Sequence, residues 1–388
     1  MGQVFNLPNN SKWQVKNLPH VTEPVDFENS NHGSPIDTSV STRPTIRLSA
    51  YPGYGFQLPD GRWSVGVSGV AWRSPVVFNR RQKMLIRMLG GVMQATDEEM
   101  ASKLFGERVT PFMTKCKPRP RISVRIGNQQ FKFEKKAKRT GRFEQRFLLD
   151  DDYIQSLPGA DTGTIDYEIF VSGGKNLPKE QSEFIVGGKI CLIPTQGVSI
   201  VSDIDDTIKE TCVGNKHELL HNTFMREFRS VPEMAELYQQ WASTGSSFHY
   251  VSASPWQMFE ALNDWRKEDK FPMGTVHLRN FRLRDQLLKK VILHRKGKRS
   301  AIQKLIRNLP RRRYILIGDS GEKDPEIYRK IARKFPSNIV GLFIRELPDH
   351  RIAPDRWQKI CEDVPGSICE RFSGAKDLQE KVARLFES

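Results

Sequence analysis

The sequence has few cysteines and no Cys-x-x-Cys pair. Its five cysteines are an odd number and lie scattered along 388 residues, which argues against a disulfide framework and against a structural zinc site. We therefore expect reduced thiols that are mostly buried. Among the eight histidines, we expect structural roles for His217, His221, His249 and His277.

Long apolar runs are also absent. No stretch of about 18 apolar residues predicts a membrane span, and residues 1–24 lack the apolar core of a secretory signal. Met1-Gly2 resembles the start of a myristoylation signal, but Asn6 stands where that signal has Ser or Thr. With 38% hydrophobic and 27% charged residues, the sequence predicts a soluble protein with a polar surface, which we expect in the cytoplasm.

Acidic residues are outnumbered, since 61 Lys and Arg face 45 Asp and Glu and the formal net charge is +16. This excess favours an anionic partner, which leaves nucleic acid, an anionic membrane and phosphorylated ligands as candidates. The densest basic stretch, Lys115 to Arg146, has 12 basic residues and two acidic ones. It could be a solvated face or a peripheral contact with anionic lipid. Nucleic acid is disfavoured because no zinc finger or RNA-binding aromatic motif accompanies it.

The composition changes near residue 45. Residues 1–44 are rich in Asn, Ser, Thr and Pro and poor in aliphatic residues, which predicts a disordered arm. In residues 45–195, apolar and polar residues alternate in short stretches such as Trp63 to Val67 and Ile122 to Ile126, as is typical of half-buried strands. We predict an antiparallel β-rich domain here.

Two short helices are predicted within this β-rich part. Apolar residues have helical spacing between Met84 and Val92, and Thr96 with Glu99 forms a capping box that opens a second helix through Leu104. The β-rich domain therefore carries helices on one of its connections.

From residue 196 to residue 388, apolar strands alternate with helical segments. Strands are predicted at 198–202, 248–252, 314–317 and 339–343, and helices at 232–242, 256–266, 298–308, 323–334 and 377–386. This alternation is typical of a parallel α/β sheet. Ser254-Pro255 has the pattern of an N-cap followed by Pro at the first helical position. The basic run Arg311 to Arg313 is expected in a solvated turn.

Three carboxylates follow the first of these strands. Asp203, Asp205 and Asp206 come directly after Val198 to Ser202, where they would repel one another unless a cation or a chemical task compensates. An acidic surface loop is the alternative. Ligands of parallel α/β sheets bind at this edge, which favours a functional site.

The spacing of these carboxylates suits phosphoryl chemistry. Asp203 and Asp205 stand two apart, so in extended conformation they project to the same side. One can attack phosphorus while the other moves a proton, and Mg²⁺ can hold the attacking group and the phosphate together. A second acidic group, Asp319 to Asp324, follows the strand at 314–317.

These motifs resemble a known family. Asp203 to Thr207, Ser252 after its strand, and Gly318-Asp319 with Asp324 are similar in content and order to the motifs of haloacid-dehalogenase-superfamily phosphatases. Longer stretches resemble the actin-patch phosphatidate phosphatases, which are distantly similar to the lipins. They are Ser202 to Lys209, Tyr250 to Gln257, Ile317 to Tyr328 and, upstream, Tyr51 to Gly55. The resemblance spans about residues 45–343 and implies a Rossmann-like sheet of the haloacid dehalogenase type.

The resemblance also implies catalytic roles. Asp203 would be the nucleophile that forms an aspartyl-phosphate, and Asp205 the acid that protonates the leaving alcohol and later activates water. Ser252 would hydrogen-bond the phosphoryl oxygens. A lysine would neutralise charge between phosphate and carboxylates, with Lys298 as first choice and Lys296 as runner-up.

A Mg²⁺ site is implied with them. Asp203 and Asp319 would be ligands, Asp205 would contribute its backbone carbonyl, and Asp324 would support the water shell. The expected function is a Mg²⁺-dependent phosphatidate phosphatase that produces diacylglycerol. The alternatives are a phosphatase for a soluble ester or phosphoprotein, and a non-enzymatic lipid-sensing module, which the presence of both Asp203 and Asp205 disfavours. The segment Lys209 to Val231 is expected to be a flap whose apolar residues either line the site or pack against the core.

Overall fold

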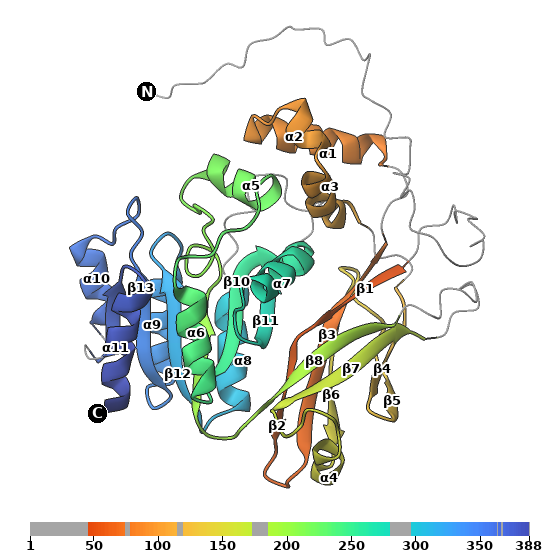
Figure 1. The fold of residues 1–388 in the computed structure, drawn as a ribbon, viewed down its shortest axis with the longest axis vertical. Helices are drawn as coiled ribbons and strands as arrows, with labels where there is room; N and C mark the ends of the chain where they lie inside the picture. Colours follow the sequence, from red (N-terminus) through yellow and green to blue (C-terminus); the bar gives the residue numbers. More distant parts are fainter. Residues whose placement is uncertain are drawn as a thin grey trace, which may run out of the picture. The chain divides into compact units, whose positions relative to one another are not determined.

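The computed structural model describes residues 46–73, 78–114, 119–172, 185–279, 296–362, 364–365 and 368–387. The predicted disordered arm, residues 1–44, lies outside this range. The described residues form two sheets and the helices around them (Figure 1).

The first sheet confirms the predicted antiparallel β-rich part. Its strand order is β1-β3-β2-β8-β7-β4-β5, with β6 paired to β3, and its pairs are antiparallel except β2 with β8. Alternate residues along these strands, such as Val65 and Val67, point into one apolar core. The strands are β1 (Ile46–Tyr51), β2 (Gly53–Gln57), β3 (Trp63–Arg73), β4 (Ile122–Ile126), β5 (Gln129–Lys132), β6 (Arg142–Leu149), β7 (Thr164–Val171) and β8 (Val186–Ile193).

Short helices connect these strands as predicted. They are α1 (Arg80–Met93), α2 (Asp97–Ala101), α3 (Lys103–Val109), the 3-10 helix η1 (Thr110–Met113) and α4 (Asp151–Gln155). The predicted capping box is confirmed, since the Glu99 amide donates to Thr96 Oγ1 over 3.2 Å and the Thr96 amide donates to Glu99 Oε2 over 2.8 Å.

The second sheet is parallel throughout, as predicted for the C-terminal half. Its order is β11-β10-β9-β12-β13-β14, which is the 3-2-1-4-5-6 order of doubly wound sheets. Ligands of such sheets bind where the order reverses, here between β9 and β12. The strands are β9 (Val198–Ser202), β10 (Ser247–Pro255), β11 (Gly274–Arg279), β12 (Arg313–Asp319), β13 (Ile339–Arg345) and β14 (Cys369–Phe372).

Helices lie along this sheet, and all of them except Lys216–Phe224, which packs in another apolar cluster, bury their apolar faces against it. They are α5 (Lys216–Phe224), α6 (Met234–Ser243), the 3-10 helix η3 (Trp256–Met258), α7 (Phe259–Glu268), α8 (Lys296–Asn308), α9 (Asp324–Lys334), α10 (Pro354–Cys361) and α11 (Ala375–Glu387). Among the described residues, none of the helices combines the length and the apolar character needed to cross a bilayer.

Two local predictions were wrong. Ser254 does not cap a helix, because β10 continues through Pro255, which pairs with Arg279, and α7 begins only at Phe259 after η3. The Ser254 hydroxyl instead donates to Asp205. Arg312 is not in a solvated turn.

The Arg312 side chain is buried at 1% exposure. Its guanidinium donates to the carbonyl oxygens of Pro194, Gln196 and Val198 and to the Ser199 hydroxyl at 2.8 Å. These carbonyls precede or begin β9. The buried Arg312 side chain therefore supplies hydrogen bonds to the residues that lead into β9, the strand that Asp203 follows.

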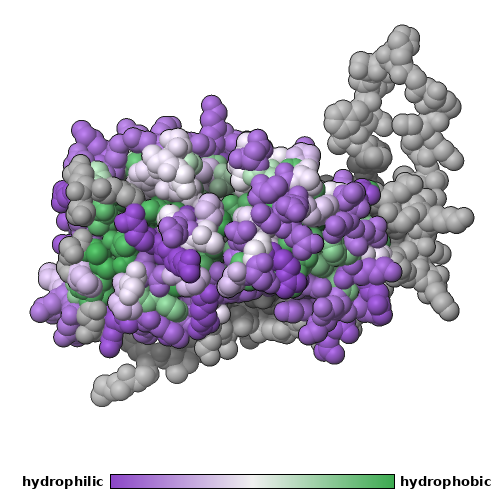
Figure 2. Space-filling model, turned by 90° about the horizontal axis from the view of Figure 1, so that it is seen from below, coloured by the Kyte–Doolittle hydropathy of each residue, from purple (hydrophilic) through white to green (hydrophobic). Residues whose placement is uncertain are grey.

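The two sheets share apolar clusters. Tyr51 of β1 packs on Phe259 of α7 with ring centroids 4.2 Å apart, and Tyr54 of β2 accepts a hydrogen bond from Asn308 of α8 at 2.7 Å. The face shown in Figure 2 is mainly hydrophilic, with a hydrophobic area at its left end and smaller ones elsewhere. The β-rich part is thus held against the parallel sheet by a packed interface.

Two histidines near β11 give a prediction for stability. Burial lowers the pKa of His249 well below its usual range, and it lowers the pKa of His277 to about 4. Both rings contact the Thr275 hydroxyl. Because the unfolded chain binds protons at these positions below about pH 6.5 and the folded chain does not, stability is expected to fall as pH drops from about 6.5 toward 4, with at most about 3 kcal/mol from His277.

Urea unfolding at about pH 7 and about pH 4.5 checks this linkage. The His249→Gln, His277→Gln double variant should lose less stability than the wild type between the two pH values. Equal losses in the two proteins would show that these histidines do not carry the acid sensitivity.

Candidate active site

Three carboxylates meet where β9 and β12 end. Ser202 and Ile317 are register partners, and the Asp203 amide donates to the Ile317 carbonyl at 2.8 Å. Asp203 follows β9, Asp319 ends β12 and Asp324 begins α9. One oxygen of each of the three carboxylates lies within 4.8 Å of the others, and all three residues are buried. The fold therefore brings together these residues from both acidic motifs.

Lys298 of α8 lies in this cluster. Its Nζ is 2.9 Å from Asp203 Oδ1, 2.5 Å from Asp324 Oδ1 and 3.4 Å from Glu322 Oε2. Burial alone would lower the pKa of Lys298, but these carboxylates raise it well above its usual range. The side chain of Lys296, the runner-up, lies outside the described residues.

One ammonium does not balance the carboxylates around it. Burial raises the pKa of Asp203 and of Asp319 well above the usual range of a carboxyl group, and the neighbouring acids add to this. The Oδ2 atoms of Asp203, Asp319 and Asp324 are buried and accept no hydrogen bond from the described residues. Buried carboxylate oxygens without donors are costly, and oxygen-only donor sets suit Mg²⁺. This donor set fits a hard divalent cation.

Backbone geometry fixes two of these carboxylates. Asp319 Oδ1 accepts the amides of Gly321 at 2.7 Å and Glu322 at 3.0 Å, which turns its other oxygen toward the cluster. A Cβ at position 318 would lie 2.4 Å from Asp324 Oδ2. Gly318 is therefore required for the close approach of α9 to the end of β12.

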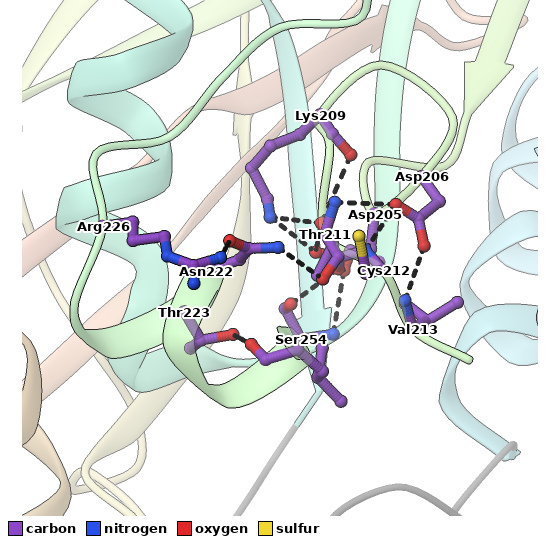
Figure 3. Close-up of polar contacts among 12 residues, drawn as sticks. Asp205, Asp206, Lys209, Thr211, Cys212, Val213, Asn222, Thr223, Arg226 and Ser254 are labelled. Atoms are coloured by element: carbon purple, nitrogen blue, oxygen red, sulfur yellow. Dashed lines mark hydrogen bonds and ion pairs between the residues drawn. The ribbon is translucent and has the colours of Figure 1, made fainter. Parts of the chain in front are cut away.

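The Asp205 side chain is not part of this group of carboxylates and has partners of its own, among them Lys209, Thr211 and Ser254 (Figure 3). Its Oδ2 accepts the hydroxyls of Ser252 at 2.8 Å and Ser254 at 2.7 Å, and its Oδ1 lies 3.1 Å from Lys209 Nζ and 3.0 Å from Thr211 Oγ1. Burial alone would raise the pKa of Asp205, but Lys209 and the two serine hydroxyls outweigh it and lower the pKa to about 2. The structure thus pairs Ser252 with Asp205.

Asp206 and Lys209 were missed as site residues. Asp206 has a φ of 54°, and its carboxylate accepts the amides of Thr211, Cys212 and Val213 at 2.7, 2.8 and 2.6 Å (Figure 3). These bonds fix the loop after β9. Lys209 is 2% exposed. The sequence signal was a lysine four residues after Asp205, whose burial the sequence alone does not show.

A cavity of about 540 Å³ opens beside these residues. Asp205, Ser252 and Lys298 line it, and β6 contributes Arg142, Glu144 and Arg146. The basic stretch predicted from the sequence is thus divided. Its residues 132–139 include five exposed basic side chains, whereas Arg142 and Arg146 line the cavity. The five are Lys132, Lys135, Lys136, Lys138 and Arg139.

The segment expected to form a flap contains α5. Leu220 and Phe224 of α5 line the cavity and also pack in an apolar cluster with Met93, Phe105 and Val109 of α1 and α3. The same side chains therefore line the site and pack against the rest of the protein, which are the two alternatives that the sequence left open. The flap is anchored to helices that connect strands of the first sheet.

Comparisons with known proteins agree with this site. Residues 198–346 match the family described as phosphatidate phosphatase APP1, catalytic domain. Phosphatidate phosphatase APP1 of Saccharomyces cerevisiae is 26% identical over 249 residues, which cover 62% of this chain and 40% of the yeast protein. Residues 198–346 belong to the APP1-like family.

This APP1-like domain holds every side chain of the carboxylate and lysine cluster. An uncharacterised protein of Schizosaccharomyces pombe is 31% identical over 164 residues, which cover 41% of this chain and 27% of that protein. The chain thus matches less than half the length of either relative. A solved structure of an uncharacterised protein from Listeria monocytogenes serotype 4b aligns over 49% of this chain and 99% of its own, at 11% identity and a TM-score of 0.32, which is too low to support a conclusion.

Proposed function

We propose that this chain is a Mg²⁺-dependent phosphatidate phosphatase of the haloacid dehalogenase type. The observation that carries the proposal is the buried group Asp203, Asp319 and Asp324 with Lys298, inside the residues that match the APP1 catalytic domain. Membrane contact through the stretch Lys115 to Arg146 and a cytoplasmic location stay predictions.

Asp203 is the proposed nucleophile. A carboxylate oxygen of Asp203 forms a bond to phosphorus as the bond from phosphorus to the alcohol oxygen breaks, which yields an aspartyl-phosphate and diacylglycerol. Water then attacks this phosphorus, inorganic phosphate leaves and the Asp203 carboxylate is restored. Lys298, whose Nζ lies 2.9 Å from Asp203 Oδ1, is proposed to neutralise charge between Asp203 and the phosphoryl group.

Asp205 is the proposed proton carrier. It lines the cavity, gives a proton to the leaving alcohol and takes one from the attacking water. Its pKa of about 2 is too low for this task near neutral pH. We therefore expect Ser252 to leave Asp205 and donate to the phosphoryl group when substrate binds, which removes one of the bonds that lower this pKa.

Asp203, Asp319 and Asp324 are the residues that would hold Mg²⁺, since they offer buried carboxylate oxygens without donors. A bound Mg²⁺ would neutralise the phosphoryl oxygens and orient them toward the nucleophile. The backbone carbonyl of Asp205 is proposed as a further ligand.

The cavity favours a lipid substrate over a soluble one. Leu219, Leu220 and Phe224 of α5 and Phe112 of η1 supply an apolar wall to this cavity, which polar side chains such as Asp205 and Ser252 also line. A diacylglycerol group can lie on this wall, whereas the polar body of a sugar phosphate or phosphopeptide gains little from it. Phosphatidate is therefore the proposed substrate.

Phosphate release from phosphatidate in mixed micelles tests the function. We expect release that stops with EDTA, returns when Mg²⁺ is added in excess, and exceeds release from soluble phosphate esters at equal concentration. Release that continues in EDTA would contradict the metal site. Faster release from the soluble esters would keep the chemistry but replace the lipid by a soluble substrate.

A further inference from the structure

Helix α1 has a cationic outer face. Its four charged residues, Arg80, Arg81, Lys83 and Arg87, are all basic and all exposed. No ion pair joins any of them to another of the described residues. This leaves a concentrated positive charge on one helix.

The same face exposes large apolar side chains. Met84 is 57% exposed and Met88 is 39% exposed. They stand four residues apart and are therefore neighbours on the helix surface, and each directly follows a basic residue, Lys83 and Arg87. Such exposure needs a reason, because the neighbouring Leu85, Leu89 and Val92 are packed against the protein.

The inner face of α1 connects this surface to the cavity. Leu85 and Leu89 pack in the cluster that includes Leu220 and Phe224 of α5, and α1 lies beside α5 (Figure 1). Leu220 and Phe224 also line the cavity. A single helix layer therefore separates the exposed methionines from the proposed lipid site.

We propose that the outer face of α1 docks on an anionic lipid bilayer, with Met84 and Met88 inserted among the headgroups and the four cations at their level. Helices that lie in a membrane interface combine these two features. The choice of a bilayer rests in part on the proposed lipid substrate. Duplex nucleic acid would use the charges but leave the methionines exposed to water.

The acidic residues of the next helix set the orientation. Asp97 and Glu98 of α2 are exposed, and Glu99 is bound to Thr96 in the capping box. An anionic surface repels them, so α1 rather than α2 faces the bilayer. The exposed basic residues 132–139 form a competing surface, but the described residues place no exposed large apolar side chain within that segment.

Flotation with vesicles tests the docking without any need for turnover. The full chain is mixed with phosphatidylcholine vesicles that contain or lack phosphatidylglycerol, in EDTA and without phosphatidate. We expect binding only with phosphatidylglycerol. The Lys83→Gln, Arg87→Gln variant should bind at least about tenfold more weakly, since each cation near such a surface contributes about fivefold. The Met84→Gln, Met88→Gln variant should also lose about tenfold.

Matched controls separate this face from general charge. Lys376 and Arg384 of α11 are exposed, and the Lys376→Gln, Arg384→Gln variant removes the same charge and should float like the wild type. Thermal unfolding shows whether each variant is folded. Normal binding by either folded α1 variant would overturn the proposal. So would a loss caused by Lys135→Gln, Lys136→Gln, Lys138→Gln but not by the α1 variants, or binding to duplex DNA in place of vesicles.

The wild type also separates this proposal from the proposed function. Release of phosphate from monomeric short-chain phosphatidate without vesicle flotation would reject the docking face and keep the function. Flotation that depends on α1, without phosphate release, would keep the docking face and reject the function.

Discussion

Replacing Asp203 by Asn is expected to lower phosphate release by about ten-thousandfold or more, the scale on which loss of a catalytic nucleophile acts. Asn has the shape of Asp, so residue 203 should keep its position after β9 and the hydrogen bond that its backbone amide donates to the Ile317 carbonyl. It cannot form a stable bond to phosphorus. It also removes one of the three carboxylates that fit a divalent cation.

The measurement is the initial rate with phosphatidate in mixed micelles, together with the yield of acid-stable phosphoprotein after rapid quenching. Wild type should give both, and Asp203→Asn neither. The control is Asp264→Asn on α7, whose side chain is 61% exposed and which should release phosphate at the wild-type rate. An Asp203→Asn variant that keeps more than a tenth of the wild-type rate would exclude Asp203 as nucleophile.

The same variant distinguishes an enzyme from a lipid-sensing module. A module needs the shape of the site and not its nucleophile, so its cellular function would survive Asp203→Asn. If the protein is an enzyme, the Asp203→Asn variant should lose turnover and keep lipid binding. Retained function together with absent turnover would therefore favour sensing, in spite of the presence of Asp205.

The convergence of Asp203 with Asp319 could be predicted because it depends on topology. Two parallel strands that are neighbours in a sheet end at the same edge, and the apolar runs before Asp203 and Asp319 identified both strands. Lys298 could be placed only through the family resemblance, since the sequence does not show which side chain of α8 reaches Asp203 and Asp324.

The partners of Asp205 could not be predicted. Ser254 is 49 residues away in sequence, and its local pattern favoured a helix cap. Tertiary contact overrode this pattern, because β10 continues to pair with β11 and carries Ser254 to the edge where Asp205 lies. The same limit applies to Arg312, whose burial follows from carbonyl groups of a segment more than 100 residues earlier.

The cavity shows why composition alone could not assign the basic stretch. Arg146 on β6 donates to the Ser64 hydroxyl at 2.7 Å and stacks over the rings of Tyr54 and Phe56. It is therefore held in the cavity wall, whereas Lys135 and Lys136 are exposed. Only the pairing of β6 with β3 decides which residues of the stretch face the site.

Replacing Lys298 by Met is expected to lower kcat by about a thousandfold, the upper range for loss of one preorganised electrostatic group. Met keeps the length and the apolar stem of lysine. It removes the ammonium that lies 2.9 Å from Asp203 and 2.5 Å from Asp324. The carboxylates then repel one another and any phosphoryl group without compensation, so the loss should appear mainly in kcat.

Arg299 supplies the matched control, since it is the next residue on α8 and is exposed. Arg299→Met removes the same charge from the same helix and should change kcat less than about twofold. Lys298→Arg should not restore activity, because a planar guanidinium cannot replace a compact ammonium in a site that leaves 3% of the side chain exposed. Thermal unfolding of each variant corrects the rates for folded protein. Equal losses of kcat in Lys298→Met and Arg299→Met would show that Lys298 acts only through the overall positive charge of α8. Full activity of Lys298→Met would show that Lys298 has no catalytic role.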